Sequence, residues 1–181
     1  GDGRFDIGGA TAAALGRIRA GVPAEEAGGG ETALGNGSLM RTLPLALAGR
    51  DLAPADLAGR ASRASAVTHA SAVARTTCAL YALVAADLVR GRTDRQAALT
   101  DATARLRDLV TGPERVALEQ ILAWPTREGR GHVIDAFWSA WDAFAGASDY
   151  RDAIARAVAY GRDTDTTACI AGGLAAAYWG F

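Results

Sequence analysis

Apolar residues recur at helical spacing along nearly the whole chain, and Gly and Pro residues separate the segments that carry this pattern. The longest such segment is residues 69–90. Its helically spaced positions are Val73, Thr77, Leu80, Val84 and Leu88. Alanines cover much of the rest of the segment, so the predicted helix is apolar on most sides. A helix of this kind is expected at the centre of a fold, surrounded by other helices.

The same pattern predicts helices before and after this segment. They are expected at residues 11–19, 38–48, 54–67, 94–110, 113–124, 132–145 and 150–159, with a last helix that begins beside Asp165. Pro54 suits the first position of its helix, whereas Pro44 is tolerated only in a first turn or at a kink. Residues 21–37 form a glycine-rich loop. No alternating pattern of useful length predicts strands, so we expect an all-α fold that forms a single domain over residues 1–181.

The composition is that of an ordinary globular domain without a bias towards a charged partner. The net charge is -1, which gives no electrostatic reason to expect nucleic acid or an anionic membrane as a partner. All 19 basic residues are Arg, which we attribute to genomic base composition rather than to phosphate binding. Cys78 and Cys169 lack metal-type spacing and are predicted to be buried, reduced thiols. No signal peptide is recognisable and polar residues interrupt every long apolar run, so we expect a cytoplasmic protein.

The stretch "GRDTDTTACIAGG" places two carboxylates, Asp163 and Asp165, at a loop-to-helix junction. Taken by itself, such a position favours helix capping, because carboxylates accept hydrogen bonds from the free amides of a first turn. A cap needs one oxygen, however, and this stretch adds the hydroxyls of Thr164 and Thr166. Carboxylates this close repel each other unless a cation lies between them, and hard oxygen donors suit Mg²⁺ or Mn²⁺. Both interpretations are open at this point.

A second candidate is the turn "GNGSLMR" at residues 35–41. Glycines before a helix leave backbone amides free to bind a phosphate or another anion, and Asn36 and Ser38 add polar side chains. The simpler interpretation is a glycine-containing loop capped by Asn36 or Ser38, and it is favoured when the turn is considered by itself. Arg41 is equally compatible with a surface position.

Three further stretches are ambiguous in the same way. A single His in an apolar setting, such as His69, is more often a structural hydrogen-bonding residue than a ligand contact. Asp6 precedes Gly8 and Gly9, where backbone can approach a ligand closely, but a helix-entry turn explains this pattern equally well. His132 lies on a glycine-flanked turn before an aromatic helix. The aromatic residues of that helix are expected in the core: Phe137, Trp138 and Trp141.

In their order along the chain, these stretches resemble the ADP-ribosylglycohydrolase family, which includes the enzymes that remove ADP-ribose from arginine on dinitrogenase reductase. The resemblance runs from about Asp6 to the C-terminus. It is most specific in "GNGSLMR" and in "DTDTTA" with the "AG" and "YWG" that follow. The weaker blocks are "FDIGGAT", "SRASAVTHAS" and "GHVIDAFWSAW". The resemblance implies a compact, multi-helix orthogonal bundle, and its all-α character agrees with the periodicity. It also implies a centre of two Mg²⁺ (or Mn²⁺) ions in a cleft among the helices.

The resemblance also implies roles for individual residues. The residues that match the C-terminal metal-binding motif are Asp163, Asp165 and Thr166. Those that would line the substrate pocket are Gly8, Gly9, Asn36, Gly37, Ser38, His69, Gly131 and His132. The last two match a segment that more often contains an aromatic residue than a His. Asp165 and Asp6 are the candidate catalytic residues, with Asp6 in electrostatic or base assistance.

Two departures from the family pattern affect this assignment. Family members carry a Thr-Asp-Asp element in an N-terminal region that supplies the remaining metal ligands. This sequence has no equivalent, since the stretch around Asp101 has a different third residue and lies in the wrong place. We therefore expect a chain that is N-terminally truncated relative to the family and holds about half of the metal site. The second departure is Arg162, which stands where the family commonly has Gly or Asn.

The implied activity is magnesium-dependent hydrolysis of the glycosidic bond that links ADP-ribose to a modified acceptor. The expected partners are an ADP-ribosylated protein or a small ADP-ribose conjugate, with no membrane and no nucleic acid indicated. The alternative is a non-catalytic ADP-ribose-binding module or a truncated, inactive relative. The acceptor stays open, because arginine, serine, an O-acyl group and a nucleic-acid end are all compatible with the sequence.

Overall fold

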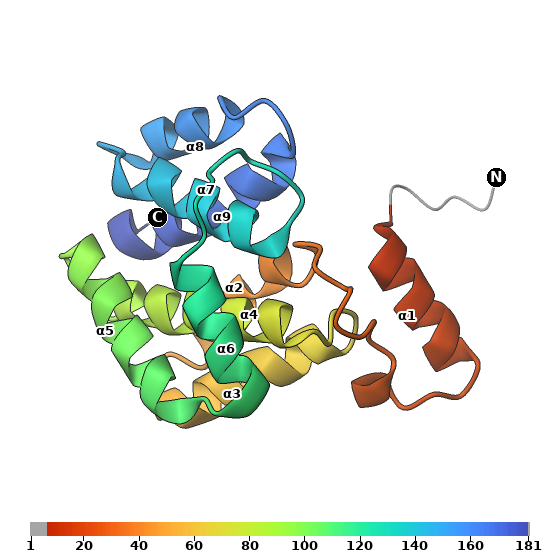
Figure 1. The fold of residues 1–181 in the computed structure, drawn as a ribbon. Coiled ribbons are helices and arrows are strands. Elements are labelled where there is room, and N and C mark those ends of the chain that lie inside the picture. Colours follow the sequence, from red (N-terminus) through yellow and green to blue (C-terminus); the bar gives the residue numbers. More distant parts are fainter. Residues whose placement is uncertain (1–6, 181) are drawn as a thin grey trace.

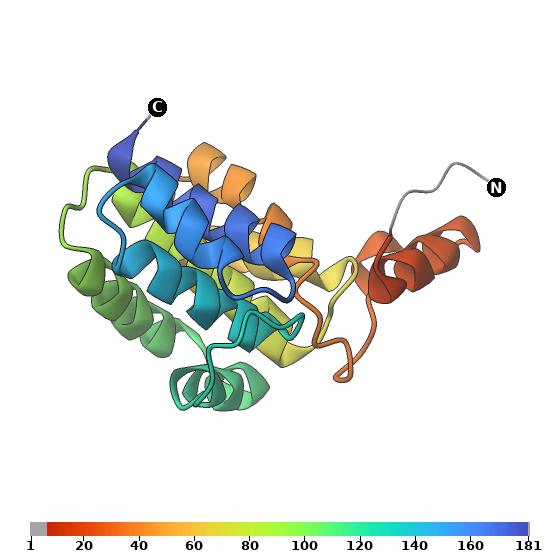
Figure 2. The same ribbon diagram turned by 90° about the horizontal axis from the view of Figure 1, so that it is seen from above.

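The computed structural model describes residues 7–180, which fold into nine α-helices and two 3₁₀ turns (Figures 1 and 2). The helices are α1 (Gly9–Arg19), α2 (Leu43–Ala48), α3 (Pro54–Ala66), α4 (Ala72–Val89), α5 (Arg95–Leu109), α6 (Gly112–Leu122), α7 (Val133–Ala145), α8 (Tyr150–Val158) and α9 (Thr164–Trp179), and the turns are η1 (Ala24–Glu26) and η2 (Leu39–Arg41). Strand-like pairing within residues 7–180 is limited to isolated bridges, Gly29 with His69 and Gly35 with His132. The predicted all-α fold is confirmed.

Helix α4 is the central element, as its periodicity predicts. It packs against α2, α3, α5, α6, α7 and α9, and its five helically spaced positions are all buried. Among the helices of residues 7–180, α4 is also the one whose length and composition would suffice to cross a membrane. Because 89% of that span is buried among the other helices, α4 has the surroundings of a core helix.

Helices α7, α8 and α9 pack on one another beside α4. Two glycines allow α9 to approach its neighbours closely. A Cβ on Gly173 would lie 2.5 Å from the hydroxyl oxygen of Tyr81 on α4, and a Cβ on Gly172 would lie 2.9 Å from Cδ1 of Ile154 on α8. The small residues after the two aspartates therefore set the close packing of α9, which fixes where its N-terminus lies. The aromatic residues of α7 are in the core, as predicted: Phe137, Trp138 and Trp141.

Helix α1 lies beside the helical body rather than inside it (Figures 1 and 2). Ala14 is the one residue of α1 that is buried. The loop that follows returns to the body and is fastened by Arg17, which donates hydrogen bonds to the carbonyls of Glu26 (2.9 Å) and Gly28 (3.1 Å). Gly28 contacts the end of α3 so closely that an added Cβ would lie 1.9 Å from the carbonyl oxygen of Ala66. This loop brings the start of α1 to one edge of the body.

Two predicted helix boundaries are wrong. The segment 38–48 is divided at Thr42 into η2 and α2, which places Pro44 in the first turn of α2, where Pro is tolerated. Helix α4 begins at Ala72 and not at His69, because Ser71 is its N-cap and accepts a hydrogen bond from the amide of Ala74 at 3.2 Å. His69 therefore lies in the turn between α3 and α4, not in a helix.

The prediction for the two thiols is half correct. Both are free, but only Cys78, in the middle of α4, is buried, whereas Cys169 is exposed. Cys169 lies one turn after Asp165 on α9, and its thiol donates to the carbonyl of Met40 at 3.4 Å. Alanine-rich neighbours in the sequence did not reveal which face of α9 carries this residue.

Candidate functional site

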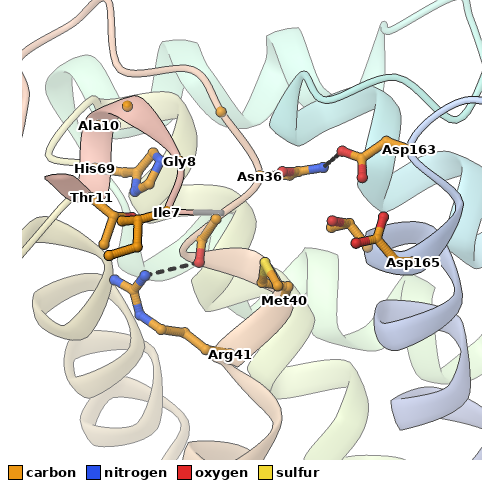
Figure 3. Close-up of a pocket in the computed structure, with 14 residues that line it drawn as sticks. Ile7, Gly8, Ala10, Thr11, Asn36, Met40, Arg41, His69, Asp163 and Asp165 are labelled. Carbon is orange, nitrogen blue, oxygen red and sulfur yellow. Dashed lines mark hydrogen bonds between the residues drawn. The ribbon is translucent and has the colours of Figure 1, made fainter. Parts of the chain in front are cut away.

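A cavity of about 600 Å³ lies where the start of α1, the turn before η2, the α3–α4 turn and the start of α9 meet. This volume is within the range of typical small-ligand pockets, about 300–1,000 Å³. Figure 3 shows Asp163 and Asp165 on one side of it, with His69 and Thr11 on the other. The lining residues are Ile7, Gly8, Gly9, Ala10, Thr11, Gly35, Asn36, Gly37, Met40, Arg41, His69, Asp163, Asp165 and Thr166.

A hydrogen bond between Asn36 and Asp163 joins the two most specific sequence stretches. The side-chain amide nitrogen of Asn36 donates to Oδ2 of Asp163 at 2.7 Å, across 127 residues of sequence. The backbone amide of Asn36 donates to the carbonyl of Gly131 at 3.0 Å, so both the main chain and the side chain of Asn36 are held. The second oxygen of Asp163 lies on the side of Asp165 (Figure 3).

Asp163 is the N-cap residue of α9 by position, but its side chain makes no capping hydrogen bond. Its carbonyl accepts from the amide of Thr167 (3.0 Å) and from the Thr167 hydroxyl (2.8 Å), and its own amide donates to the carbonyl of Gly129 (2.9 Å). The local interpretation of a side-chain cap is therefore wrong for Asp163. The backbone makes the helix junction, and this leaves the carboxylate available to the cavity.

Asp165 and Thr166 lie in the first turn of α9, on the same cavity wall. Carboxylates in a first turn are favoured by the positive end of the helix dipole. The Asp165 carboxylate also acts on its neighbour Cys169. Although Cys169 is exposed as a residue, partial desolvation of its thiol and, secondarily, the charge of Asp165 raise the pKa of that thiol. Asp163, Asp165 and Thr166 thus present only oxygen donors. Within residues 7–180 there is no group of three or more His, Cys, Asp or Glu residues able to hold a metal ion.

The loop between α6 and α7 holds this wall in place from behind, through the buried carboxylate of Asp135. Asp135 accepts hydrogen bonds from the amides of Arg130 (2.8 Å) and Glu128 (3.2 Å) and from the hydroxyl of Thr126 (3.0 Å). Burial by itself would raise the pKa of Asp135, but these hydrogen bonds and one from Ser139 outweigh it and hold the pKa below its usual value. The loop so fixed supplies the carbonyls that accept from Asn36 and Asp163.

His69 forms part of the opposite wall and is only 2% exposed. Its Nδ1 lies 2.7 Å from the hydroxyl oxygen of Thr68, which accepts a hydrogen bond from Nη2 of Arg41 at 2.6 Å. Burial lowers the pKa of His69, and the positive charge of Arg41 lowers it further. Both effects favour the neutral form of the ring.

The N-terminal segment closes the cavity with backbone and small side chains. Gly8 is the N-cap residue of α1, and an added Cβ on Gly8 or Gly9 would meet nothing within 4 Å. Thr11 lies near the turn before η2, since a Cβ on Gly37 would be 3.8 Å from its hydroxyl oxygen. Asp6, the candidate for electrostatic assistance, lies outside the described residues.

Three predicted pocket residues do not line the cavity. Ser38 is buried beneath it, where its hydroxyl accepts from the Ser65 hydroxyl at 2.9 Å. Gly131 lies behind Asp163, and a Cβ there would be 3.4 Å from Oδ2 of that residue. His132 accepts a hydrogen bond from the amide of Ile134 at the start of α7 (3.3 Å). The ligand contact of these three residues stays a prediction, and their place in the structure is that of supports for the wall.

The ring of His132 also stacks on Trp124, with ring centroids 4.6 Å apart. Arg162, the other departure from the family pattern, is largely exposed and forms an ion pair with Glu128 at 3.5 Å. Asp101 is on α5, where it pairs with Arg92, and is not part of the cavity.

Comparison with known proteins shows to which family the chain belongs. The model of the family described as ADP-ribosylglycohydrolase matches residues 1–181, the full length of the chain. The chain belongs to this family. A solved chain of an ADP-ribosylglycohydrolase-related protein complex is similar to it, with 34% identity and a TM-score of 0.77; the match covers 96% of this chain and 59% of that one. The chain thus spans 59% of the length of this solved relative. No curated protein matches it.

The candidate site contains residues that the sequence did not single out as pocket residues. Met40 and Arg41 line the cavity, as do Ile7, Ala10, Thr11 and Gly35. Arg41 lies inside the most specific motif, "GNGSLMR", four residues after Gly37, whose carbonyl accepts from its Nη1 at 2.8 Å. The position of Arg41 within this motif could therefore have indicated that it belongs to the pocket. Nothing in the sequence indicated that Thr68 would connect Arg41 to His69.

Proposed function

We propose that this chain binds ADP-ribose in the cavity and takes part in magnesium-dependent hydrolysis of the glycosidic bond that links ADP-ribose to an acceptor. The observation that carries the proposal is the meeting of Asp163, Asp165 and Thr166 with Asn36 and His69 around one cavity, in a member of the ADP-ribosylglycohydrolase family. These residues come from three segments far apart in sequence. Only the fold brings them to the same cavity.

The donor set of the α9 wall fits a hard cation. Two carboxylates and a hydroxyl are oxygen donors, which Mg²⁺ and Mn²⁺ prefer over nitrogen and sulfur. Asp163, Asp165 and Thr166 would hold the metal, as the residues of this chain that contribute to a centre of two ions. When bound, the metal would polarise the reacting bond and lower the pKa of a bound water. Asn36 occupies one oxygen of Asp163, so the other oxygen would be the one that binds.

The residues of the chain have separable tasks in this proposal. Asn36 orients the Asp163 carboxylate through the 2.7 Å hydrogen bond. The negative charges of Asp163 and Asp165 stabilise positive charge that develops at the anomeric carbon in an oxocarbenium-like transition state. The turn at Gly35–Gly37 offers backbone to the polar groups of the nucleotide. Asp165 is the candidate to orient the attacking water, and Asp6 stays a candidate for assistance.

The substrate class we propose is an ADP-ribosylated protein or a small ADP-ribose conjugate. The test is release of ADP-ribose from such substrates by the purified protein in the presence of Mg²⁺. The variants Asp163→Asn and Asp165→Asn should each reduce the rate at least a hundredfold, since each removes one of the few charges on the wall. The matched control is Asp51→Asn, which removes a carboxylate that is 82% exposed and outside the cavity. Activity retained by both cavity variants would refute the assignment.

A second function is binding of ADP-ribose without turnover. It is favoured by the small number of metal ligands. The wall offers two carboxylates, and within residues 7–180 no third His, Cys, Asp or Glu residue joins them to hold a metal. Calorimetric titration with ADP-ribose separates the two functions. Binding that is unchanged by Mg²⁺, together with no release of ADP-ribose, supports the binding module. Binding that is strengthened by Mg²⁺ and lost in Asp165→Asn supports the hydrolase.

A further inference from the structure

The guanidinium of Arg41 lies at the cavity wall, and its hydrogen bonds run to the protein. Nη1 donates to the carbonyl of Gly37 at 2.8 Å, and Nη2 donates to the hydroxyl oxygen of Thr68 at 2.6 Å. That same hydroxyl oxygen lies 2.7 Å from Nδ1 of His69. Arg41, Thr68 and His69 thus form a chain of hydrogen bonds that ends in the cavity wall.

The direction of this chain follows from the chemistry of its members. A guanidinium has only donors, and a hydroxyl has one hydrogen and two lone pairs. Arg41 therefore uses one lone pair of Thr68. The second lone pair could accept from a protonated Nδ1, so the hydroxyl hydrogen decides the direction. Among residues 7–180, Nδ1 of His69 is the one acceptor within hydrogen-bond distance of this hydroxyl. The hydrogen therefore points to Nδ1, which accepts. A neutral imidazole whose Nδ1 accepts carries its hydrogen on Nε2.

We propose that Arg41, acting through Thr68, fixes His69 as the neutral tautomer with its proton on Nε2, so that the ring offers the cavity a hydrogen-bond donor and not a base. Arg41 is then a positioning residue. Nε2 lies on the side of the glycine turn, since an added Cβ on Gly35 would be 3.3 Å from it and one on Gly37 would be 3.5 Å from it. The two glycines leave this edge of the ring open.

The charges around His69 agree with this assignment. Arg41 is the charged group on its own side of the cavity, and a nearby cation disfavours the imidazolium form. Cys78 of α4 acts electrostatically on Arg41. The carboxylates that share the cavity, Asp163 and Asp165, lie on the opposite wall (Figure 3).

A donor at this position selects for an acceptor oxygen in the ligand, such as an anionic or a hydroxyl oxygen. This statement about the ligand deepens the proposed function and rests on it. The tautomer itself does not, because it is a property of the free protein. It can therefore be measured without substrate and without metal, and its failure would leave the hydrolysis assay untouched.

The experiment is long-range ¹H–¹⁵N spectroscopy of the histidine rings in the full chain at pH 7.5 with a chelator. The sequence contains two His residues, so His132→Gln assigns both sets of signals. His132 also serves as an internal reference, because its Nδ1 accepts from the amide of Ile134 independently of Arg41. In the wild-type protein we expect Nδ1 of His69 at the shift of an unprotonated nitrogen and Nε2 at that of a protonated one.

Two substitutions test the relay. Thr68→Val keeps the shape of a buried β-branched side chain but removes the hydroxyl, so Nδ1 of His69 should move towards the protonated shift; Thr68→Ser should restore the wild-type pattern. Arg41→Met should raise the pKa of His69 in a pH titration and leave that of His132 unchanged. A wild-type His69 with its proton on Nδ1, or one that is charged at pH 7.5, would overturn the proposal. If Thr68→Val does not fold, the wild-type spectrum and the Arg41→Met titration still decide the question.

Discussion

Asn36 and Asp163 are 127 residues apart in sequence, and the side-chain amide of one donates to the carboxylate of the other at 2.7 Å. This hydrogen bond connects the turn before η2 to the N-cap residue of α9, across the wall of the cavity (Figure 3). It also explains why Asp163 does not cap its own helix. The carboxylate is oriented by a partner from another segment, which suits a group that must keep one oxygen directed into a site.

Replacing Asn36 tests this pair directly. Asn36→Ala removes a hydrogen bond to a charged group and should lower the free energy of unfolding by about 1.5–3 kcal/mol. Asn36→Asp should cost more in a metal-free buffer at pH 7.5, because two carboxylates would then face each other. Chemical denaturation of both variants, with and without Mg²⁺, measures this. We expect Mg²⁺ to recover part of the stability of Asn36→Asp but not of Asn36→Ala; equal stability of the two variants in metal-free buffer would contradict the account.

Gly129 is predicted to be irreplaceable for a steric reason. Its carbonyl accepts from the amide of Asp163, its φ is +64°, and an added Cβ would lie 2.5 Å from Cβ of Tyr160. Gly161 provides the matched control, because its φ is +72° but its nearest contact for a Cβ is 4.0 Å away. Gly161→Ala should cost only the backbone strain, about 1 kcal/mol. Gly129→Ala should cost at least about 3 kcal/mol by thermal or urea unfolding, and similar losses at the two positions would show that the clash is unimportant.

Asp135 is expected to be a structural support of the site. Asp135→Ala would leave the amides of Glu128 and Arg130 and the hydroxyl of Thr126 without their acceptor, at a cost of about 3 kcal/mol or more. Asp135→Asn keeps one acceptor oxygen and should lose less. Ligand affinity should fall together with stability, because the same loop holds Asn36 and Asp163. An Asp135→Ala protein as stable as wild type in urea would rule out this role.

Stability should decrease as the solution is acidified below pH 6.5. Burial lowers the pKa of both His69 and His132 in the folded state. The unfolded chain therefore binds more protons in this range, and each His can contribute a loss of up to about 1.4 kcal/mol per pH unit. The raised pKa of Asp142 acts in the opposite direction at lower pH, so the window to measure is pH 7.5 to 5.5. Urea unfolding in the presence of a chelator should show the decline in the wild type and a flatter profile in His69→Gln/His132→Gln; a wild-type stability that rises on acidification would be inconsistent with it.

The helical content and the central position of α4 follow from the sequence because both depend on periodicity. Boundaries were less predictable, since Ser71 competes with His69 as the start of α4 and the pairing of the α3–α4 turn with Gly29 is a long-range contact. The side of α9 on which Cys169 lies could not be read from alanine-rich neighbours. For these features, tertiary contacts decide between local alternatives that have similar propensities.

The candidate site was found in the sequence by its motifs rather than by its chemistry. Asp163, Asp165, Asn36, Gly37 and His69 were all predicted at the pocket and all line the cavity. Each motif considered singly favoured a structural role, because the same residue types also cap helices and fill turns. The supporting contacts could not be predicted, since an acceptor such as Asp135 or a connecting hydroxyl such as that of Thr68 has no local signature.

The most direct test of the central claim is a crystal structure of this chain grown with Mn²⁺ and ADP-ribose, with anomalous data collected near the manganese edge. We expect an anomalous peak among the oxygens of Asp163, Asp165 and Thr166, with ADP-ribose in the cavity beside it. Data from Asp165→Asn crystals grown in the same way should lose the peak. ADP-ribose bound elsewhere, or a cavity in which Mn²⁺ is held by other residues, would contradict the claim that α9 carries the metal-binding wall of this site.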